Sequence, residues 1–200
     1  MVTSRVLVSN VGWFKTLVIA AALCSGLSGF ARAEQLESLL PPFAGKGYDF
    51  KKESKDDHHI SGWLPVKWCD NSKWAAVNAT FTKLDDSPDK DQAAVRIEVK
   101  NVDDGQLQLT SFEGNSEYKK GATYLVTGWV RSERFTQLLV GAREEDDPHD
   151  FYKQIEVPTG ARWSKFKLEW TPEMDCVAWI MFVIKAPGTV DVAGITVTEK

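Results

Sequence analysis

From Trp63 onward the chain alternates between apolar and polar residues with a period of two, which is the pattern of a half-buried β-strand. Turn sequences rich in aspartate, glycine and proline separate these segments, and no long stretch has helical periodicity. Many short strands joined by turns predict an all-β fold, a jelly-roll sandwich of two antiparallel sheets. The segments with the clearest alternation are 95–99, 107–110, 124–131, 138–142 and 166–170.

The apolar members of these segments are predicted to form the core, because alternate residues of a strand point to the same face of its sheet. Residues 177–184 are apolar at nearly every position, as expected for a strand in the middle of a sheet. The predicted core residues are Val95, Ile97, Leu107, Leu109, Tyr124, Val126, Val130, Leu138, Val140, Phe166, Leu168, Ile180 and Phe182.

The first 33 residues have the features of a secretory signal peptide. Arg5 and Lys15 precede an apolar run over 16–30, which is shorter than the ~20 residues of a membrane span. The run ends at Ala31-Arg32-Ala33, a small-residue cleavage site, and we expect a secreted or periplasmic product; a retained anchor is the alternative. The expected organisation is a signal peptide at 1–33, an N-terminal leader at 34–47 and the sandwich domain at 48–200.

Composition and charge exclude several classes of function. The chain has 200 residues, of which 43% are hydrophobic, and a formal net charge of −4, so it is neither disordered nor a basic nucleic-acid-binding protein. Loss of residues 1–33 would remove three basic and no acidic residues and make the formal net charge −7. There is no later apolar stretch of spanning length, no phosphate-binding glycine loop and no nucleophile elbow, so we expect neither an enzyme nor a cofactor.

Three polar features remain after this exclusion. Cys69 and Cys176 could form a disulfide in an oxidising compartment, or remain two separate buried thiols. The acidic stretch Glu144–Asp150 could bind an ion or supply carboxylates for glycoside hydrolysis, but we interpret it as a charged hairpin loop. His58 and His59 are adjacent and would point to opposite sides of an extended chain, so we expect no metal site there.

Neutral polar and aromatic residues occupy outward-facing positions of several predicted strands, where charged residues are usual. Sugars bind to such surfaces, because their C–H faces pack on aromatic rings and their hydroxyls hydrogen-bond to amide and guanidinium groups. We predict one face that contacts a neutral or weakly charged glycan; the alternative is a set of plain solvated side chains. The predicted ligand-binding residues are Gln106, Gln108, Trp129, Arg131 and Gln137.

The other tryptophans divide into two groups. Trp63, Trp163 and Trp170 belong to predicted strands or their ends, and we expect them mainly in the core. Trp68 and Trp74 lie on either side of Cys69 and are candidates for the end of a groove.

Five stretches together resemble the secreted carbohydrate-binding modules associated with cellulases and xylanases (families four, nine and twenty-two). Lys120–Arg131 (KGATYLVTGWVR) is similar to their lysine-glycine-x-x-tyrosine strand. The other four follow in the expected order, and the resemblance covers about residues 48–200. They are Gly62-Trp63, Gln92–Val99, Arg162–Phe166 and Gly188–Val197.

The resemblance implies a galactose-binding-like jelly roll with a glycan groove across the concave sheet or at the loop tips. Many relatives hold a structural calcium with carboxylates at positions that read Phe50-Lys51 and Ala193-Gly194 here, so we expect no metal. The resemblance implies a non-catalytic module whose partner is a glycan or polysaccharide. The alternative is a structural or protein-interaction jelly roll of the cell envelope, with a protein partner and no sugar affinity.

Overall fold

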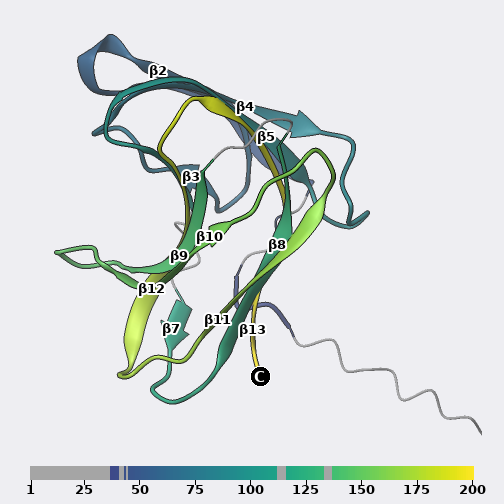
Figure 1. The fold of residues 1–200 in the computed structure, drawn as a ribbon, viewed down its shortest axis with the longest axis vertical. Helices are drawn as coiled ribbons and strands as arrows, with labels where there is room; N and C mark the ends of the chain where they lie inside the picture. Colours follow the sequence, from purple (N-terminus) through teal and green to yellow (C-terminus); the bar gives the residue numbers. More distant parts are fainter. Residues whose placement is uncertain (1–36, 41–42, 44, 112–115, 133–136) are drawn as a thin grey trace, which may run out of the picture. The chain divides into compact units, whose positions relative to one another are not determined.

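The computed structural model describes residues 37–40, 43, 45–111, 116–132 and 137–200, which form two facing β-sheets (Figure 1). The first sheet has seven strands in the order β1-β2-β4-β5-β13-β8-β11, and we call it the seven-stranded sheet. Its strands are β1 (Gly47–Glu53), β2 (His59–Pro65), β4 (Ala76–Leu84), β5 (Ala94–Asp104), β13 (Gly188–Glu199), β8 (Tyr124–Arg131) and β11 (Ser164–Trp170).

The second sheet has six strands in the order β10-β9-β12-β6-β3, with β7 paired to β12, and we call it the six-stranded sheet. Figure 1 shows β9 and β12 on one side of the fold and β8, β11 and β13 on the other. Its strands are β10 (Phe151–Val157), β9 (Leu138–Glu144), β12 (Cys176–Ile184), β6 (Leu107–Thr110), β3 (Cys69–Asp70) and β7 (Ser116–Tyr118).

The period of two correctly predicted which side chains lie between the sheets. All thirteen predicted core residues are buried, none with more than 5% of its surface exposed. β12 is buried on both faces over 180–184, as its continuous apolar sequence indicated. The all-β, two-sheet class is therefore confirmed.

The predicted purely antiparallel pairing is wrong at one place, because β2 and β4 pair in parallel. Gly62 lies in this pairing with a φ of +129°, and a Cβ there would lie 1.9 Å from the carbonyl oxygen of Phe81. Glycine is therefore required for the close approach of these two strands.

The segment expected as a leader contributes to the core. Leu40 and Phe43 are buried, and the Phe43 ring packs edge-on against Trp68 with 5.0 Å between ring centroids. The backbone N–H of Ala93 donates to the carbonyl of Phe43 over 2.6 Å. Because side chains and backbone both anchor the segment, the folded unit begins before β1.

No helix in the part of the chain that the structure describes is long and apolar enough to cross a lipid bilayer. The helix found there is the short 3₁₀ turn η1 (Lys55–Asp57) between β1 and β2. The expected signal peptide lies outside the described residues.

No disulfide joins Cys69 and Cys176, so the pairing alternative is not realised. Cys69 lies opposite Thr110 on β6, and Thr110 lies opposite Met181 on β12. Cys176 is five positions before Met181, which at ~3.3 Å per residue is roughly 16 Å along the strands. A disulfide tolerates at most ~7 Å between Cα atoms, so this fold keeps the two thiols apart.

Candidate functional site

The five predicted ligand-binding residues do not share one face, so the prediction that a single face bears all of them is wrong. Trp129 and Arg131 lie on β8, on the outer face of the seven-stranded sheet. Gln108 lies on β6, and Gln106 and Gln137 directly precede β6 and β9 in the six-stranded sheet. Strand alternation tells whether a side chain points inward or outward, but it does not tell to which of the two sheets the strand belongs.

Arg131 is held by carboxylates of its own sheet rather than left for a ligand. Its Nε donates to Asp191 Oδ2 over 2.8 Å, and its Nη1 donates to Asp86 Oδ2 over 2.6 Å. The guanidinium also lies 4.4 Å from the centre of the Trp163 ring. Asp191, whose side chain is 2% exposed, accepts a second arginine, because Arg96 Nε donates to its Oδ1 over 2.8 Å. We call Arg96, Arg131 and Asp191 the Asp191 cluster. Both oxygens of the Asp191 carboxylate accept hydrogen bonds from arginine, and Asp86 supplies a second negative charge to Arg131.

Trp129 is half-buried beside the same cluster. The Nζ of Lys165 lies 5.6 Å from the centre of its ring, within the range of a cation–π contact. The neighbouring Trp163 is also half-buried on the outside of this sheet, whereas Trp170 is in the core as expected. These rings cover part of the sheet surface, and Trp129 lines neither of the two cavities described below.

A groove of about 440 Å³ opens instead on the outer face of the six-stranded sheet. It is lined by residues from the loop after β3, from β9 and β12, and from the hairpin between β9 and β10. Trp74 is 52% exposed, and Trp179 is half-buried on β12. The lining residues, which we call the Trp179 groove, are Asn71, Trp74, Arg143, His149 and Trp179.

Strand register places two of these side chains next to each other. Trp179 on β12 lies directly opposite Arg143 on β9, and Phe151 on β10 lies opposite Arg143 from the other side. The Phe151 ring packs over Gly141, where a Cβ would lie 2.5 Å from the ring. Arg143 lies 5.7 Å from the centre of the Phe151 ring, so this aromatic ring supports the guanidinium from below the groove.

The β9–β10 hairpin brings His149 back over the sheet. His149 has a φ of +63°, and its N–H donates to the carbonyl of Asp146 over 2.8 Å. Its ring lies parallel to Trp179, with 6.2 Å between centroids and 18° between planes. The left-handed backbone at a non-glycine residue is a conformation that surrounding contacts must hold, and such residues are frequent at binding sites.

Gln108 was predicted to be a surface residue, but it is completely buried behind the groove. Asn71 Nδ2 approaches its side-chain amide to 3.1 Å. With the amide oxygen turned toward Arg143, Arg143 Nη1 donates to it over 3.2 Å and Gln106 Nε2 donates over 2.7 Å. Gln106 and Gln108 therefore position the groove residues Asn71 and Arg143 from beneath.

Gln137 lies on the same sheet but away from the groove. It is exposed and precedes Arg143 by six residues, which at ~3.3 Å per residue is about 20 Å along β9. The sequence pattern therefore indicated Gln106 and Gln108, which lie beneath the groove, and Trp74, which lines it. Arg143, His149 and Trp179 carried no signal, because only strand pairing brings Trp179 next to the β9–β10 hairpin.

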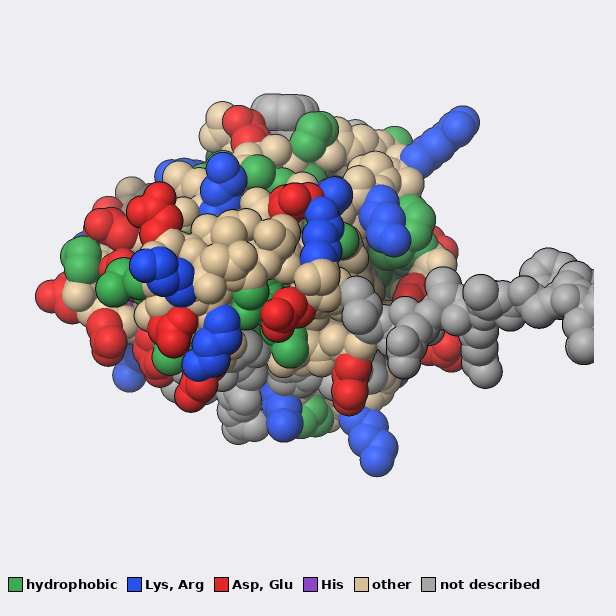
Figure 2. Space-filling view, turned by 90° about the horizontal axis from the view of Figure 1, so that it is seen from below, with side chains coloured by type: hydrophobic (Ala, Val, Ile, Leu, Met, Phe, Trp, Pro, Cys, Tyr) green, Lys and Arg blue, Asp and Glu red, His purple; other side chains and the backbone are tan. Residues whose placement is uncertain are grey.

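The acidic stretch forms the tip of the β9–β10 hairpin, beside the groove. Asp146, Asp147 and Asp150 are exposed. Figure 2 shows acidic side chains gathered at the left end, where Figure 1 places the hairpin. No group of three potential metal ligands occurs within the described residues. The positions at which relatives carry calcium ligands hold an exposed Lys51 and a buried Ala193, and the absence of a structural metal stays a prediction.

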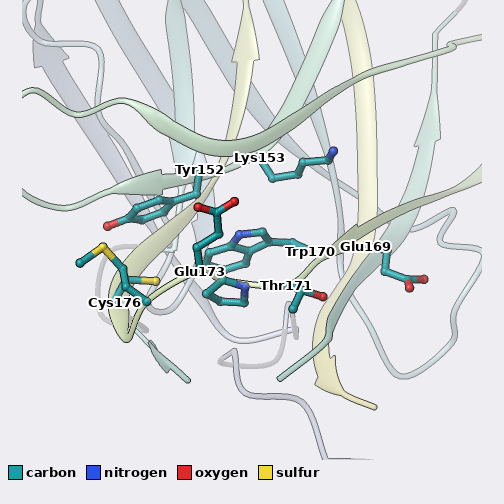
Figure 3. Close-up of a pocket in the computed structure, with 9 residues that line it drawn as sticks. Tyr152, Lys153, Glu169, Trp170, Thr171, Glu173 and Cys176 are labelled. Carbon is teal, nitrogen blue, oxygen red and sulfur yellow. The ribbon is translucent and has the colours of Figure 1, made fainter. Parts of the chain in front are cut away.

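A second cavity, of about 490 Å³, lies between β10, β11 and the start of β12 (Figure 3). A β-bulge at Tyr152 turns its ring onto Trp170, with 5.6 Å between centroids and 16° between planes. Burial raises the pKa of Cys176 and of Tyr152, so both remain protonated at neutral pH. Exposed Met174 also lines the cavity, together with the charged side chains of Lys153, Glu169 and Glu173.

Comparison with solved structures identifies the fold. The structure is similar to a carbohydrate-binding module of family four, with a TM-score of 0.51 and 15% identity over 66% of this chain and 86% of that one. It is also similar to a candidate sugar binding protein from Bacteroides thetaiotaomicron, with a TM-score of 0.51 and 12% identity over 82% of this chain and all of that one.

A third similar structure is the enzymatically active domain of tailspike protein 4 from bacteriophage CBA120, with a TM-score of 0.54 and 15% identity. That match covers 68% of this chain but 20% of the tailspike. No protein-family model and no curated protein sequence matches the chain. The predicted resemblance to carbohydrate-binding modules is therefore confirmed for the fold, which by itself assigns no ligand.

Proposed function

We propose that this protein is a non-catalytic glycan-binding protein whose binding site is the Trp179 groove. The observation that carries the proposal is the composition of one groove: two tryptophans, a guanidinium and an amide lie together on an outer sheet face. Aromatic rings provide stacking area for the C–H face of a sugar, and Asn71 and Arg143 provide hydrogen bonds to hydroxyls. The similarity of the fold to a family-four module supports this proposal.

The same lining supports the non-catalytic part of the proposal. Hydrolysis of a glycosidic bond uses a pair of carboxyl groups on either side of the bond. The described residues that line the groove include no aspartate or glutamate. Asp146, Asp147 and Asp150 at the hairpin tip are exposed to solvent and do not line the groove.

The proposal is tested by affinity electrophoresis of residues 34–200 in gels containing a panel of soluble polysaccharides. We expect retardation by at least one polymer without release of reducing ends. Trp179→Ala should remove the retardation, whereas Trp129→Ala, the matched tryptophan of the other sheet, should leave it unchanged. Retardation that is equal in both variants would place the site elsewhere.

A protein-interaction role remains the alternative, and one observation favours it. Met174 and Val177 are 63% and 36% exposed near the second cavity, and exposed apolar side chains are typical of protein contacts. Lack of binding to every polysaccharide would favour this alternative, in which Met174→Ser should weaken capture of an envelope protein.

We also propose that the protein is exported after removal of residues 1–33. The support is the charged start, the apolar run and the small-residue site at Ala33. N-terminal sequencing of secreted or periplasmic material should begin near Glu34. A product that retains Met1 and sediments with membranes would contradict export as a free protein.

A further inference from the structure

Four lysine and arginine side chains in the described part of the chain are only partly exposed, and they differ in how their charge is balanced. Lys52 is paired with Asp70, while Arg96 and Arg131 are paired with Asp191. Arg143 has no carboxylate oxygen within ion-pair distance among the described residues. It is therefore the exception, and it lies in the proposed binding groove.

The hydrogen bonds that Arg143 makes to described residues all go to neutral groups. Its Nε donates to the carbonyl of His149 over 2.5 Å, and its Nη1 contacts the Gln108 amide and, at 3.6 Å, the sulfur of Met181. These contacts fix the orientation of the guanidinium, but they do not neutralise its charge. No hydrogen bond from Nη2 to a described residue is found, so that edge of the guanidinium is available to a ligand.

The direction of the pKa shift of Arg143 agrees with the lack of a carboxylate partner. Burial lowers the pKa of the guanidinium, and the nearby charge of Asp150 raises it by less, so the net direction is downward. Arg131 shows the opposite direction: burial lowers its pKa, but Asp86 and Asp191 together outweigh this effect and the pKa is raised. An arginine whose charge is disfavoured by its surroundings gains from an anionic ligand that supplies the missing counter-charge.

We propose that Arg143 binds the carboxylate of an acidic sugar, so that the glycan in the Trp179 groove contains uronate residues. This inference rests on the proposed function, because it names the sugar class bound at the same groove. A guanidinium presents two parallel N–H groups that match the two oxygens of a carboxylate. Trp179 lies directly opposite Arg143 across the strand pair, so one ring can contact the sugar whose carboxylate Arg143 holds.

The hairpin adds a restriction on this ligand, because exposed Asp146, Asp147 and Asp150 place negative charge next to the groove residue His149. Because like charges repel a dense polyanion, the favoured glycan has single uronates separated by neutral sugars rather than a run of adjacent acids.

The experiment compares native polymers with the same polymers after chemical reduction of their carboxyl groups to hydroxymethyl groups. The probes are hyaluronan and xanthan, in which uronates are separated by neutral sugars, alginate and polygalacturonate, in which acids are adjacent, and neutral galactomannan and β-glucan. Affinities for the wild type, R143Q, R143K and W179A are measured by affinity electrophoresis and calorimetry. A sulfated polymer without carboxylates, dextran sulfate, distinguishes a sulfate from a carboxylate.

The inference predicts that the tightest-binding polymer contains separated uronates and that carboxyl reduction weakens its binding at least ~10-fold. R143Q should bind the native and reduced polymers equally. R143K should retain part of the preference for the native polymer, because lysine keeps the positive charge but lacks the two parallel N–H groups of arginine. If a neutral polymer binds best and W179A abolishes its binding while R143Q does not, the proposed function stands and this inference is overturned. Preference for dextran sulfate, or no binding at all, also overturns it.

Thermal unfolding without ligand provides a readout that does not depend on the choice of polymer. R143Q removes a charge that no described carboxylate balances, together with hydrogen bonds to His149 and Gln108, so its unfolding temperature should fall only slightly. R131Q is the matched control and should unfold at a lower temperature, because it leaves Asp191 with one fewer partner. If R143Q loses as much stability as R131Q, Arg143 is a structural residue and the inference is wrong.

Discussion

The outer faces of the two sheets carry the same kinds of residue but use them differently. On the seven-stranded sheet, Arg131 stands between Asp86 and Asp191 and packs on Trp163. On the six-stranded sheet, Arg143 stands beside Trp179 and finds carbonyl, amide and sulfur partners. An arginine beside a tryptophan therefore does not mark a binding face; what distinguishes the two faces is whether the protein itself supplies the counter-charge.

The largest expected effect is on the face where the charges are paired. Asp191→Ala would leave Arg96 and Arg131 without their shared, buried carboxylate, and removal of one member of a buried ion pair typically costs about 3–5 kcal/mol. The free energy of unfolding from urea titration should fall by this order. Asp86→Ala, which removes an exposed carboxylate from the same arginine, is the control and should cost much less.

The next effect tests the groove itself. Trp179→Ala should weaken glycan binding about 20–30-fold, because truncation of an aromatic anchor typically costs ~2 kcal/mol. Trp129→Ala on the opposite sheet should change affinity by less than about twofold by the same reasoning. Calorimetry on both variants, with unfolding temperatures measured in parallel, distinguishes a lost contact from a lost fold. Equal losses of affinity would remove the proposed difference between the two faces.

A smaller effect is expected from the layer beneath the groove. Gln108→Ala would leave Asn71 and Arg143 without their shared amide, so both would be held less precisely. Loss of such a neutral hydrogen-bonding group costs about 1 kcal/mol, which corresponds to a decrease of ~5-fold in affinity. The variant should also be less stable than wild type, since Gln108 is fully buried. An affinity loss as large as that of Trp179→Ala would mean that Gln108 contacts the ligand directly.

The smallest effect concerns the turn between β1 and β2. His58 Nε2 donates to Asp103 Oδ2 over 2.7 Å, and this hydrogen bond raises the pKa of His58 above its ordinary value of 6.5. A raised pKa in the folded state stabilises the fold below the unfolded pKa, and this contribution is lost as pH rises through the folded pKa.

The effect is measured as the urea concentration at the midpoint of unfolding, at a series of pH values from about 5.5 to 8.5. The wild type should lose stability across this range more steeply than His58→Gln, which cannot titrate. Glycan affinity should follow the same pH dependence in both proteins, because His58 lies outside the groove. Parallel stability curves would show that the His58–Asp103 contact is not maintained in solution.

The sequence by itself determined the strands, their inward-facing residues and the kind of fold. Alternation has a period of two because successive side chains of a strand point to opposite faces, so Val95, Ile97 and Val126 could be assigned to the core without a structure. The order of the glycine and tryptophan motifs was enough to indicate a carbohydrate-binding-like sandwich. The outward direction of Trp129 was also correct.

Only the tertiary structure decided which outward-facing residues lie together. The strand order interleaves segments from the whole chain, so Asn71, Arg143 and Trp179 converge although about 110 positions separate the first from the last. Whether an arginine is neutralised depends on such distant partners: Asp191 reaches Arg131 from 60 positions away, and no carboxylate reaches Arg143 among the described residues. Alternation carries no information on these contacts, because it is a local property and sheet order is not.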